Sequence, residues 1–354
     1  MNADKSNELR DTVLEAANAK TPLRIQGSGS KDFIGQAPSG ERLSLREHRG
    51  IVNYQPNELV LTARAGTRLA DIESQIAQHR QMLPFEPPHF GPDATLGGTI
   101  ACGLSGPRRP YAGSARDFVL GVRMINGKGE ILRFGGEVMK NVAGFDASRL
   151  MVGAMGTLGV LLDISMKVLP RPETEATLVF ELGAAAAIDR MTQWSGKPLP
   201  ISAACHDGQR LHLRLSGAAS GVNAARQRLG GETLNSADAF WRSVRELSHP
   251  FFDDDAPLWR YSLPPATAAL TFSKHWFIDW GGAQRWVKTV LPANIVRETA
   301  ARAGGHATLF YSVRRESTFF HPLTPAALTL HKRLKAAFDP HGILNPGRLY
   351  RDIG

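Results

Sequence analysis

The chain has 354 residues, 42% of them hydrophobic and 21% charged, which predicts about two or three globular domains. It has a polar start, MNADKSNELRD, and no long uncharged apolar run, so we expect a cytoplasmic protein without a spanning helix or secretory signal. The net charge of +9 favours anionic partners, but the basic residues are dispersed, which disfavours nucleic-acid binding. The two cysteines, Cys102 and Cys205, are too few and too far apart for a disulfide framework, zinc knuckle or iron–sulfur cluster within this chain.

A helix is predicted from Ser6 to about Thr21, because Leu9, Val13 and Ala16 recur on one face. A short strand at 23–25 then leads into a turn of alternating glycine and serine. Such a turn presents several backbone N–H groups and hydroxyls in one place and can hold a phosphate; a flexible surface turn is the alternative. The turn lacks the Lys-Ser/Thr spacing of a Walker A loop.

Strand and helix patterns alternate through the next hundred residues. Residues 58–65 predict a half-buried strand, and Thr67 is expected to cap a helix whose buried face includes Leu69 and Ile76. The proline-rich segment 84–92 should be irregular. Residues 119–125 and 130–134 predict a hairpin, and 160–168 a strand with one apolar face.

Glycine is concentrated in this half of the chain. Between Gly91 and Gly159 lie 15 of the 35 glycines, more than turns alone require, so we expect main chain to approach a ligand closely. The segment Ala94-Thr95-Leu96-Gly97-Gly98-Thr99-Ile100-Ala101 fits that role. Gly153, Gly156 and Gly159 superficially resemble a dinucleotide fingerprint but lack its G-x-G start and the following βαβ unit.

After residue 172 the composition changes. All six tryptophans fall in this part, together with alternating strand and helix patterns, which indicates a separate α+β domain with its own core. Thr324-Pro325 starts a last helix, with its apolar side chains expected to point inward. These are Ala327, Leu330, Leu334 and Phe338. The tail that follows is turn chemistry around one polar side chain, Asn345.

The order of these motifs resembles the FAD-binding domain of the vanillyl-alcohol oxidase / p-cresol methylhydroxylase flavoprotein family. Three longer strings are similar to those of the FAD-binding subunits of bacterial glycolate oxidases: PPHFGPDATLGGTIACGLSGPRRP, RFGGEVMKNVAGFD and FIDWGGAQRW. The likeness runs from about Thr21 to Tyr350.

The resemblance implies an α+β fold with a two-lobed PCMH-type FAD-binding domain (1–171), a smaller α+β cap domain that serves substrate or interface (172–323), and a C-terminal helix and tail (324–354) returning to the flavin. It implies FAD held by the Gly/Ser turn, the ATLGG segment, the end of the glycine-rich stretch and the tail. The expected contacts are Gln26, Gly27, Ser28, Gly29, Ser30, Thr95, Gly97, Gly98, Gly159, Val160 and Asn345. Members with covalent flavin use His or Cys in the early loop or near Cys102. The early loop has neither, and Cys102 lies among small residues, so we expect non-covalent FAD.

Oxidation of a 2-hydroxy acid such as glycolate requires a cation for the carboxylate and a base for the hydroxyl proton. Arg108 and Arg109, after the glycine cluster, are the candidate cations, with solvated surface arginines as the alternative. Lys140-Asn141 could also face the flavin. His306, in a glycine-rich setting, is the candidate base, although a lone histidine is more often structural. No metal site is expected, since His206 and His212 on a predicted hairpin have no glutamate companion.

The resemblance implies a complex with a larger homologous flavoprotein subunit and an iron–sulfur subunit, associated peripherally with the cytoplasmic face of the inner membrane. Two functions follow from it. The chain oxidises glycolate itself, or it is an FAD-bearing relay or assembly subunit beside a catalytic partner.

Overall fold

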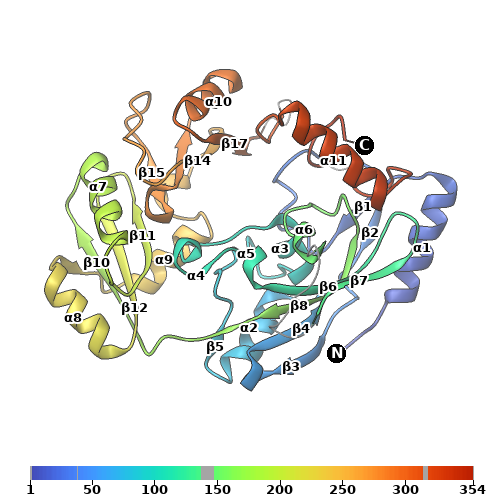
Figure 1. Cartoon of the computed structure of the whole chain (residues 1–354), viewed down its shortest axis with the longest axis horizontal. Helices are drawn as coiled ribbons and strands as arrows, with labels where there is room; N and C mark the ends of the chain where they lie inside the picture. Colours follow the sequence, from blue (N-terminus) through green and yellow to red (C-terminus); the bar gives the residue numbers. More distant parts are fainter. Residues whose placement is uncertain (1, 38, 137–146, 314–317, 354) are drawn as a thin grey trace. The chain divides into compact units, whose positions relative to one another are not determined.

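The structure is a computed structural model that describes residues 2–37, 39–136, 147–313 and 318–353 (Figure 1). The chain divides into two compact units: Met1–Leu104, Ser114–Pro170 and Pro322–Gly354 form the first, and Ser105–Gly113 with Arg171–His321 form the second. The domain boundaries expected from the sequence stay a prediction. The compact units assign the C-terminal helix and tail to the first unit, and the short Ser105–Gly113 segment to the second.

The first unit is built on a five-stranded antiparallel sheet in the order β3-β4-β8-β6-β7. A parallel pair, β1 and β2, and a short antiparallel pair, β5 and β9, complete its strands. The elements are α1 (Ser6–Ala19), β1 (Leu23–Gln26), β2 (Glu41–Ser44), β3 (Ile51–Gln55), β4 (Val60–Arg64), α2 (Leu69–Ala77), β5 (Gln81–Met82), α3 (Leu96–Cys102), α5 (Ala115–Phe118), β6 (Val119–Ile125), β7 (Ile131–Gly135), α6 (Ala147–Leu150), β8 (Val160–Lys167), β9 (Leu169–Pro170) and α11 (Pro325–Phe338).

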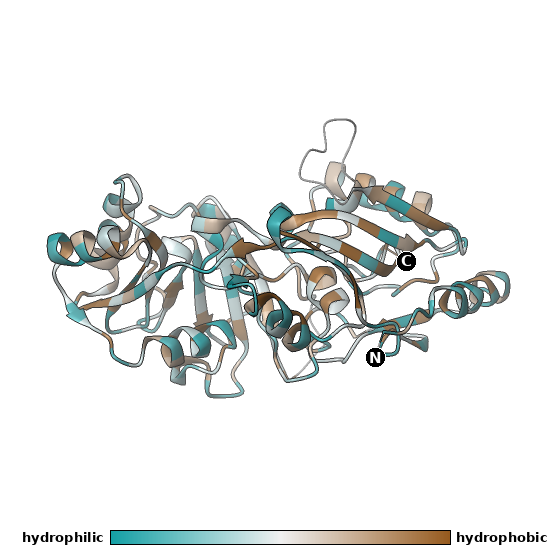
Figure 2. Ribbon diagram, turned by 90° about the horizontal axis from the view of Figure 1, so that it is seen from below, coloured by the Kyte–Doolittle hydropathy of each residue, from teal (hydrophilic) through white to brown (hydrophobic). Residues whose placement is uncertain are grey.

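Much of this unit follows the sequence patterns. Helix α1 buries the predicted face, the β6–β7 hairpin pairs as expected, and Val160, Leu162 and Ile164 on β8 are fully buried. The helices carry both hydrophilic and hydrophobic stretches, as amphipathic helices do (Figure 2).

Three details differ from the predictions. Strand β4 is buried on both faces rather than half-buried, since polar Thr62 is buried as well as its apolar neighbours and shares a hydrogen bond of 2.8 Å with Ser165 of β8. Arg68, not Thr67, is the N-cap residue of α2; the Thr67 hydroxyl instead bonds the backbone of Gly50. In α11, Thr324 caps the helix as predicted, but Leu330 is 57% exposed.

The second unit contains an eight-stranded sheet, all of whose neighbouring strands pair antiparallel, in the order β13-β10-β12-β11-β15-β16-β14-β17. Its apolar core includes Trp194, Trp259 and Trp276, which confirms the α+β class with a separate core. The elements are α4 (Arg109–Ala112), β10 (Thr174–Phe180), α7 (Ala184–Ser195), β11 (Ile201–His206), β12 (Leu211–Gly217), α8 (Ala219–Leu229), β13 (Glu232–Thr233), α9 (Ala237–Arg245), β14 (Leu258–Ser262), β15 (Phe277–Asp279), β16 (Gln284–Lys288), α10 (Ala293–Arg302) and β17 (His306–Tyr311).

Within the described ranges, no helix is long and apolar enough to cross a membrane.

Candidate cofactor site

Two adjoining hollows lie in the first unit, each of about 500 Å³ with its opening to solvent included. The first is lined mainly by small and apolar residues, and the second by the Gly/Ser turn and two cationic side chains. The residues that line both are Ile25, Gly27, Thr95, Gly98, Ala101, Met155 and Asn345. One extended ligand could therefore occupy both hollows continuously.

Two glycines in the lining leave the hollow open and let neighbouring segments pack closely behind it. A Cβ at Gly27 would overlap the Thr95 hydroxyl, and a Cβ at Gly97 would lie 2.7 Å from the Cβ of Ala65. Thr95 is the N-cap of α3, where its hydroxyl accepts a hydrogen bond from the Gly98 N–H at 3.3 Å. Any larger residue at Gly27 would therefore disturb the start of α3 as well as fill the hollow.

The Gly/Ser turn forms one side of the second hollow. Gly29 adopts a φ of +85°, which glycine tolerates best. The turn is braced by Asp32, whose carboxylate accepts hydrogen bonds of 2.6 Å from both Gln26 and Arg24. Gln26 therefore has a structural bond within the turn in addition to lining the hollow.

Two buried cations, Lys31 and Arg348, line the same hollow. Lys31 Nζ donates to the His89 carbonyl at 3.0 Å, and the Arg348 guanidinium donates to the carbonyls of Gln36 and Lys31. Both positive charges therefore lie at the lining of this hollow. Backbone N–H groups of a turn beside cationic side chains suit a diphosphate.

Asn345 ties three segments of the site together. Its Oδ1 accepts a hydrogen bond of 2.7 Å from the Ile25 N–H, and its Nδ2 donates one of 2.7 Å to the Met155 carbonyl. The residue has a φ of +42°, a region that asparagine adopts more readily than most other non-glycine residues. The tail thus fastens β1 to the glycine-rich segment at the edge of both hollows.

The tail is held in place by a buried ion pair. Lys335 Nζ donates to Asp339 Oδ2 at 2.7 Å, to the Thr157 carbonyl at 2.9 Å and to the Leu344 carbonyl at 2.7 Å. Asp339 in turn accepts hydrogen bonds from the N–H groups of Ile343 and Leu344. Burial lowers the Lys335 pKa, while Asp339 opposes that shift. The sequence patterns did not indicate Lys335, because a lysine in the last turns of a helix is usually a solvated residue.

Ten of the eleven expected cofactor contacts line at least one hollow. The exception is Val160, which is fully buried in β8 and lines neither, whereas its neighbour Gly159 lines the first. Cys102, at the end of α3, lines the second hollow, and burial raises the pKa of its thiol. It is therefore predominantly a neutral thiol at neutral pH, which is a poor nucleophile.

The candidate catalytic residues lie in the second unit, where only some of them come together. Arg108 is buried and forms an ion pair with Glu175. Arg109 is exposed, with its Cζ 4.3 Å from the centre of the Trp280 ring. The Trp280 indole also donates a hydrogen bond of 3.1 Å to the Gly106 carbonyl, so the FIDWGGAQRW string anchors the segment that carries both arginines.

A residue that the sequence reasoning missed joins them. Arg260 on β14 is half-buried, and its Cζ lies 5.5 Å from the centre of the Phe310 ring. Burial and the charge of Arg109 lower the pKa of Arg260 to about 10. No carboxylate of the described residues pairs with Arg260. The signal in the sequence was weak, since a single arginine in a strand is common.

His306 begins β17 and is exposed as a whole residue. Partial desolvation of its ring and the charges of Arg260 and His321 lower its pKa below the ordinary 6.5. The imidazole is therefore neutral at neutral pH and able to accept a proton.

The other histidines singled out in the sequence have protein partners. His206 bonds the Leu182 carbonyl at 2.9 Å, and His212 bonds Asp207 at 2.8 Å. No group of three or more potential metal ligands occurs in the part of the chain that the structure describes. Lys140 and Asn141 lie outside the described residues.

Fold and site together define a class of protein whose two adjoining hollows, lined by a Gly/Ser turn and a C-terminal tail, could hold an extended, anionic cofactor. Residues 1–135 match the model of the FAD binding domain, and 315–349 that of the C-terminal domain of FAD linked oxidases. The chain is 50% identical over 350 residues to the glycolate oxidase subunit GlcE of Escherichia coli, covering 99% of both chains. It is 30% identical to the glycolate oxidase subunit GlcD of Bacillus subtilis, over 49% of this chain and 37% of that protein.

A solved structure of alkyldihydroxyacetonephosphate synthase shares the fold, with a TM-score of 0.67 at 15% identity over 96% of this chain and 74% of that one. The chain therefore belongs to the FAD-linked oxidase family of PCMH-type flavoproteins, as its resemblance to that family predicted. FAD is its cofactor. The geometry of the first unit fits this cofactor, since the glycines leave a continuous lining and two cations flank the phosphate-compatible turn.

Proposed function

We propose that this chain is the FAD-binding subunit of a complex that oxidises glycolate to glyoxylate. The observation that carries the proposal is the 50% identity to a glycolate oxidase subunit over 99% of both chains. The cradle of the first unit supports it, because every segment expected to hold FAD lines one of the two hollows.

The cofactor contacts remain proposals residue by residue. We assign the diphosphate to the turn from Gln26 to Ser30, with Lys31 and Arg348 supplying positive charge. Thr95, Gly97, Gly98 and Gly159 form the wall that lies against the rest of the cofactor. Asn345 acts through its two backbone hydrogen bonds, which hold the wall together, and Val160 supports it from within the sheet.

FAD, when bound, supplies the acceptor for a hydride from the carbon that bears the substrate hydroxyl. Arg109 and Arg260 would hold the substrate carboxylate, since their charges lie close enough to lower the Arg260 pKa. Arg108 would position the segment rather than bind substrate, because Glu175 already takes its guanidinium. His306 would take the hydroxyl proton as its neutral imidazole.

The FAD is proposed to be dissociable. Cys102 is the one cysteine at the cradle, and burial keeps its thiol protonated. Acid precipitation should leave the flavin in the supernatant and a colourless pellet. A yellow pellet would show a covalent bond instead.

The complex is proposed to contain a larger homologous flavoprotein and an iron–sulfur subunit that receives the electrons, with peripheral association at the inner membrane. The domain assignment (1–171, 172–323 and 324–354) belongs to the same proposal. The second candidate function is an FAD relay or assembly subunit. It is favoured by the absence of a His/Glu metal cluster among the described residues.

Anaerobic mixing of the purified, FAD-loaded chain with glycolate distinguishes the two candidates. Rapid bleaching of the flavin absorbance supports catalysis by this chain, and no bleaching supports the relay. Arg260→Met should then weaken glycolate binding by about tenfold or more, the value of one charge-assisted hydrogen bond. Arg226→Met is a matched control on the exposed surface of the second unit.

A further inference from the structure

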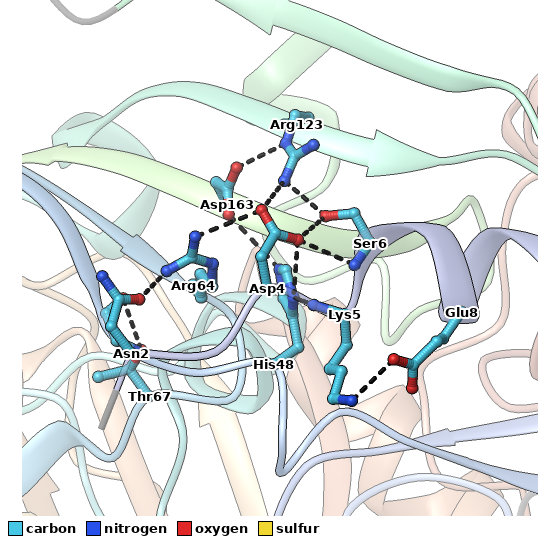
Figure 3. Close-up of polar contacts among 11 residues, drawn as sticks. Asn2, Asp4, Lys5, Ser6, Glu8, His48, Arg64, Thr67, Arg123 and Asp163 are labelled. Atoms are coloured by element: carbon cyan, nitrogen blue, oxygen red, sulfur yellow. Dashed lines mark hydrogen bonds and ion pairs between the residues drawn. The ribbon is translucent and has the colours of Figure 1, made fainter.

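The N-terminal residues Asn2 to Ser6, which we call the strap, pack on the first unit through specific polar contacts (Figure 3). Ala3 and Arg49 exchange two backbone hydrogen bonds of 2.8 and 3.2 Å. A Cβ at Gly50 would overlap the Asn2 side chain. The strap is thus an ordered part of the unit, although neither the family motifs nor the proposed chemistry uses it.

His48 is the residue on which the strap rests. Its side chain is fully buried, and its Nδ1 accepts a hydrogen bond of 3.0 Å from the Lys5 N–H. Nδ1 can accept only if the ring proton is on Nε2, which lies 3.5 Å from Asp163 Oδ1. Neither Nε2 nor that oxygen has another hydrogen-bond partner among the described residues. One buried imidazole therefore connects the strap to strand β8.

Charged side chains of three adjacent strands surround this connection. Arg64 of β4 and Arg123 of β6 both stand opposite Asp163 of β8 in the strand register. Asp4 of the strap lies 3.3 Å from Arg64 and 3.6 Å from Arg123. Figure 3 shows Asp4 between the two guanidinium groups. The strap thus supplies the second carboxylate that balances two arginines of the sheet.

The backbone of His48 continues this connection to the cofactor cradle. Its N–H donates to the Leu45 carbonyl at 3.0 Å, and its carbonyl accepts from the Gly66 N–H at 2.9 Å. Leu45 and Ala65, the neighbour of Gly66, line the first hollow. Leu161, two residues before Asp163 on the same face of β8, lines it as well.

We propose that the strap and His48 form a positioning device for FAD: the Lys5–His48 hydrogen bond fixes the Leu45–Gly50 loop, and this loop holds the wall of the first hollow. The strap makes no contact with the hollow itself. Its effect is on how well the wall is organised before the cofactor arrives, which sets the affinity.

Two substitutions at His48 test its two contacts separately. In His48→Gln, the amide can approximate the Nε2 contact to Asp163 but loses the acceptor for Lys5. In His48→Asn, the shorter amide can retain the Lys5 bond and loses the Asp163 contact. Leu178→Ala is a control that creates a cavity in the second unit, far in sequence from the strap.

Two measurements on the full-length protein test the proposal: FAD affinity, from quenching of flavin fluorescence on titration into apoprotein, and amide hydrogen exchange of the apoprotein at Leu45, His48 and Gly66. We expect His48→Gln to weaken FAD binding about tenfold, the equivalent of one buried hydrogen bond, and to speed exchange at these amides. His48→Asn should lie closer to wild type.

Faster exchange with unchanged FAD affinity would overturn the proposal, since the loop would then be fixed without consequence for the cofactor. An equal loss of affinity in Leu178→Ala, at a matched decrease in melting temperature, would overturn it too, because general destabilisation would explain the effect. Failure of the wild-type apoprotein to bind FAD would instead refute the cofactor assignment on which the proposal rests.

Discussion

The cofactor cradle, which is the pair of hollows in the first unit, and the cation cluster of Arg109 and Arg260 in the second unit are built by opposite means. The cradle is mostly backbone, small side chains and turns, so that a few glycines determine its shape. The cluster consists of two long charged side chains, one on strand β14 and one on the short helix α4, and each lies against an aromatic ring. The first kind of site is rigid and intolerant of added atoms. The second depends on charge and can be altered without disturbing the fold.

The largest expected effect concerns His306, the proposed base in the second unit. If His306 is the base, His306→Asn should lower kcat for glycolate by about 100- to 10,000-fold, the usual contribution of a general base. In wild type, kcat/KM should rise with pH through a value below 6.5, because a lowered His306 pKa means that the active neutral form persists to lower pH. A variant with nearly normal turnover would assign the proton to another group. Flavin content, measured by absorbance, is the control.

The next effect concerns the buried ion pair between Lys335 and Asp339. Lys335→Met leaves Asp339 buried without its cation, which should cost about 3–5 kcal/mol in the free energy of unfolding. Urea denaturation followed by circular dichroism measures it. The double variant Lys335→Met/Asp339→Asn should recover part of the loss, since no uncompensated charge remains. A single variant as stable as wild type would contradict the buried pair.

The cradle itself is tested by Gly27→Val. The new side chain would overlap Thr95, so FAD affinity should fall by about 10- to 100-fold through overpacking. Gly196→Ala, where a Cβ meets no atom within 4 Å, is the matched control and should bind FAD normally. Equal affinities for the two variants would show that the hollow is not the cofactor site.

The smallest expected effect concerns the contribution of one carboxylate, Asp207, to the stability of the second unit at low pH. Asp207 bonds His212 and the N–H groups of Gln209 and Arg210, and the bond to His212 is the main cause that holds its pKa below the ordinary 3.8 against the opposing effect of burial. A depressed folded-state pKa means that the stabilisation is complete above pH about 4 and is lost as the pH falls further. Asp207→Asn should therefore flatten the acid limb of a plot of unfolding free energy against pH. An unchanged acid limb would contradict this role.

The sequence by itself determined the cofactor more firmly than the reaction. Gly27, Gly97 and Gly98 stand out because glycine in such numbers has few structural explanations, and the tail around Asn345 is equally distinctive. The apolar periodicities of α1 and β8 likewise fixed which faces are buried, because burial of apolar surface dominates local patterning.

Other features depend on contacts between distant segments, which no local pattern encodes. The tertiary structure alone shows that Arg108 pairs with Glu175, 67 residues away, and that Arg260 has no carboxylate partner within the described ranges. The burial of both faces of β4 depends on the segments that pack on each side of the sheet, and the exposure of Leu330 depends on which side of α11 packs. The roles of Lys335 and His48 appear only in the tertiary structure. It brings carbonyl and carboxylate oxygens around Lys335, which by type alone would be expected at the surface, and a backbone N–H and a carboxylate around the His48 ring.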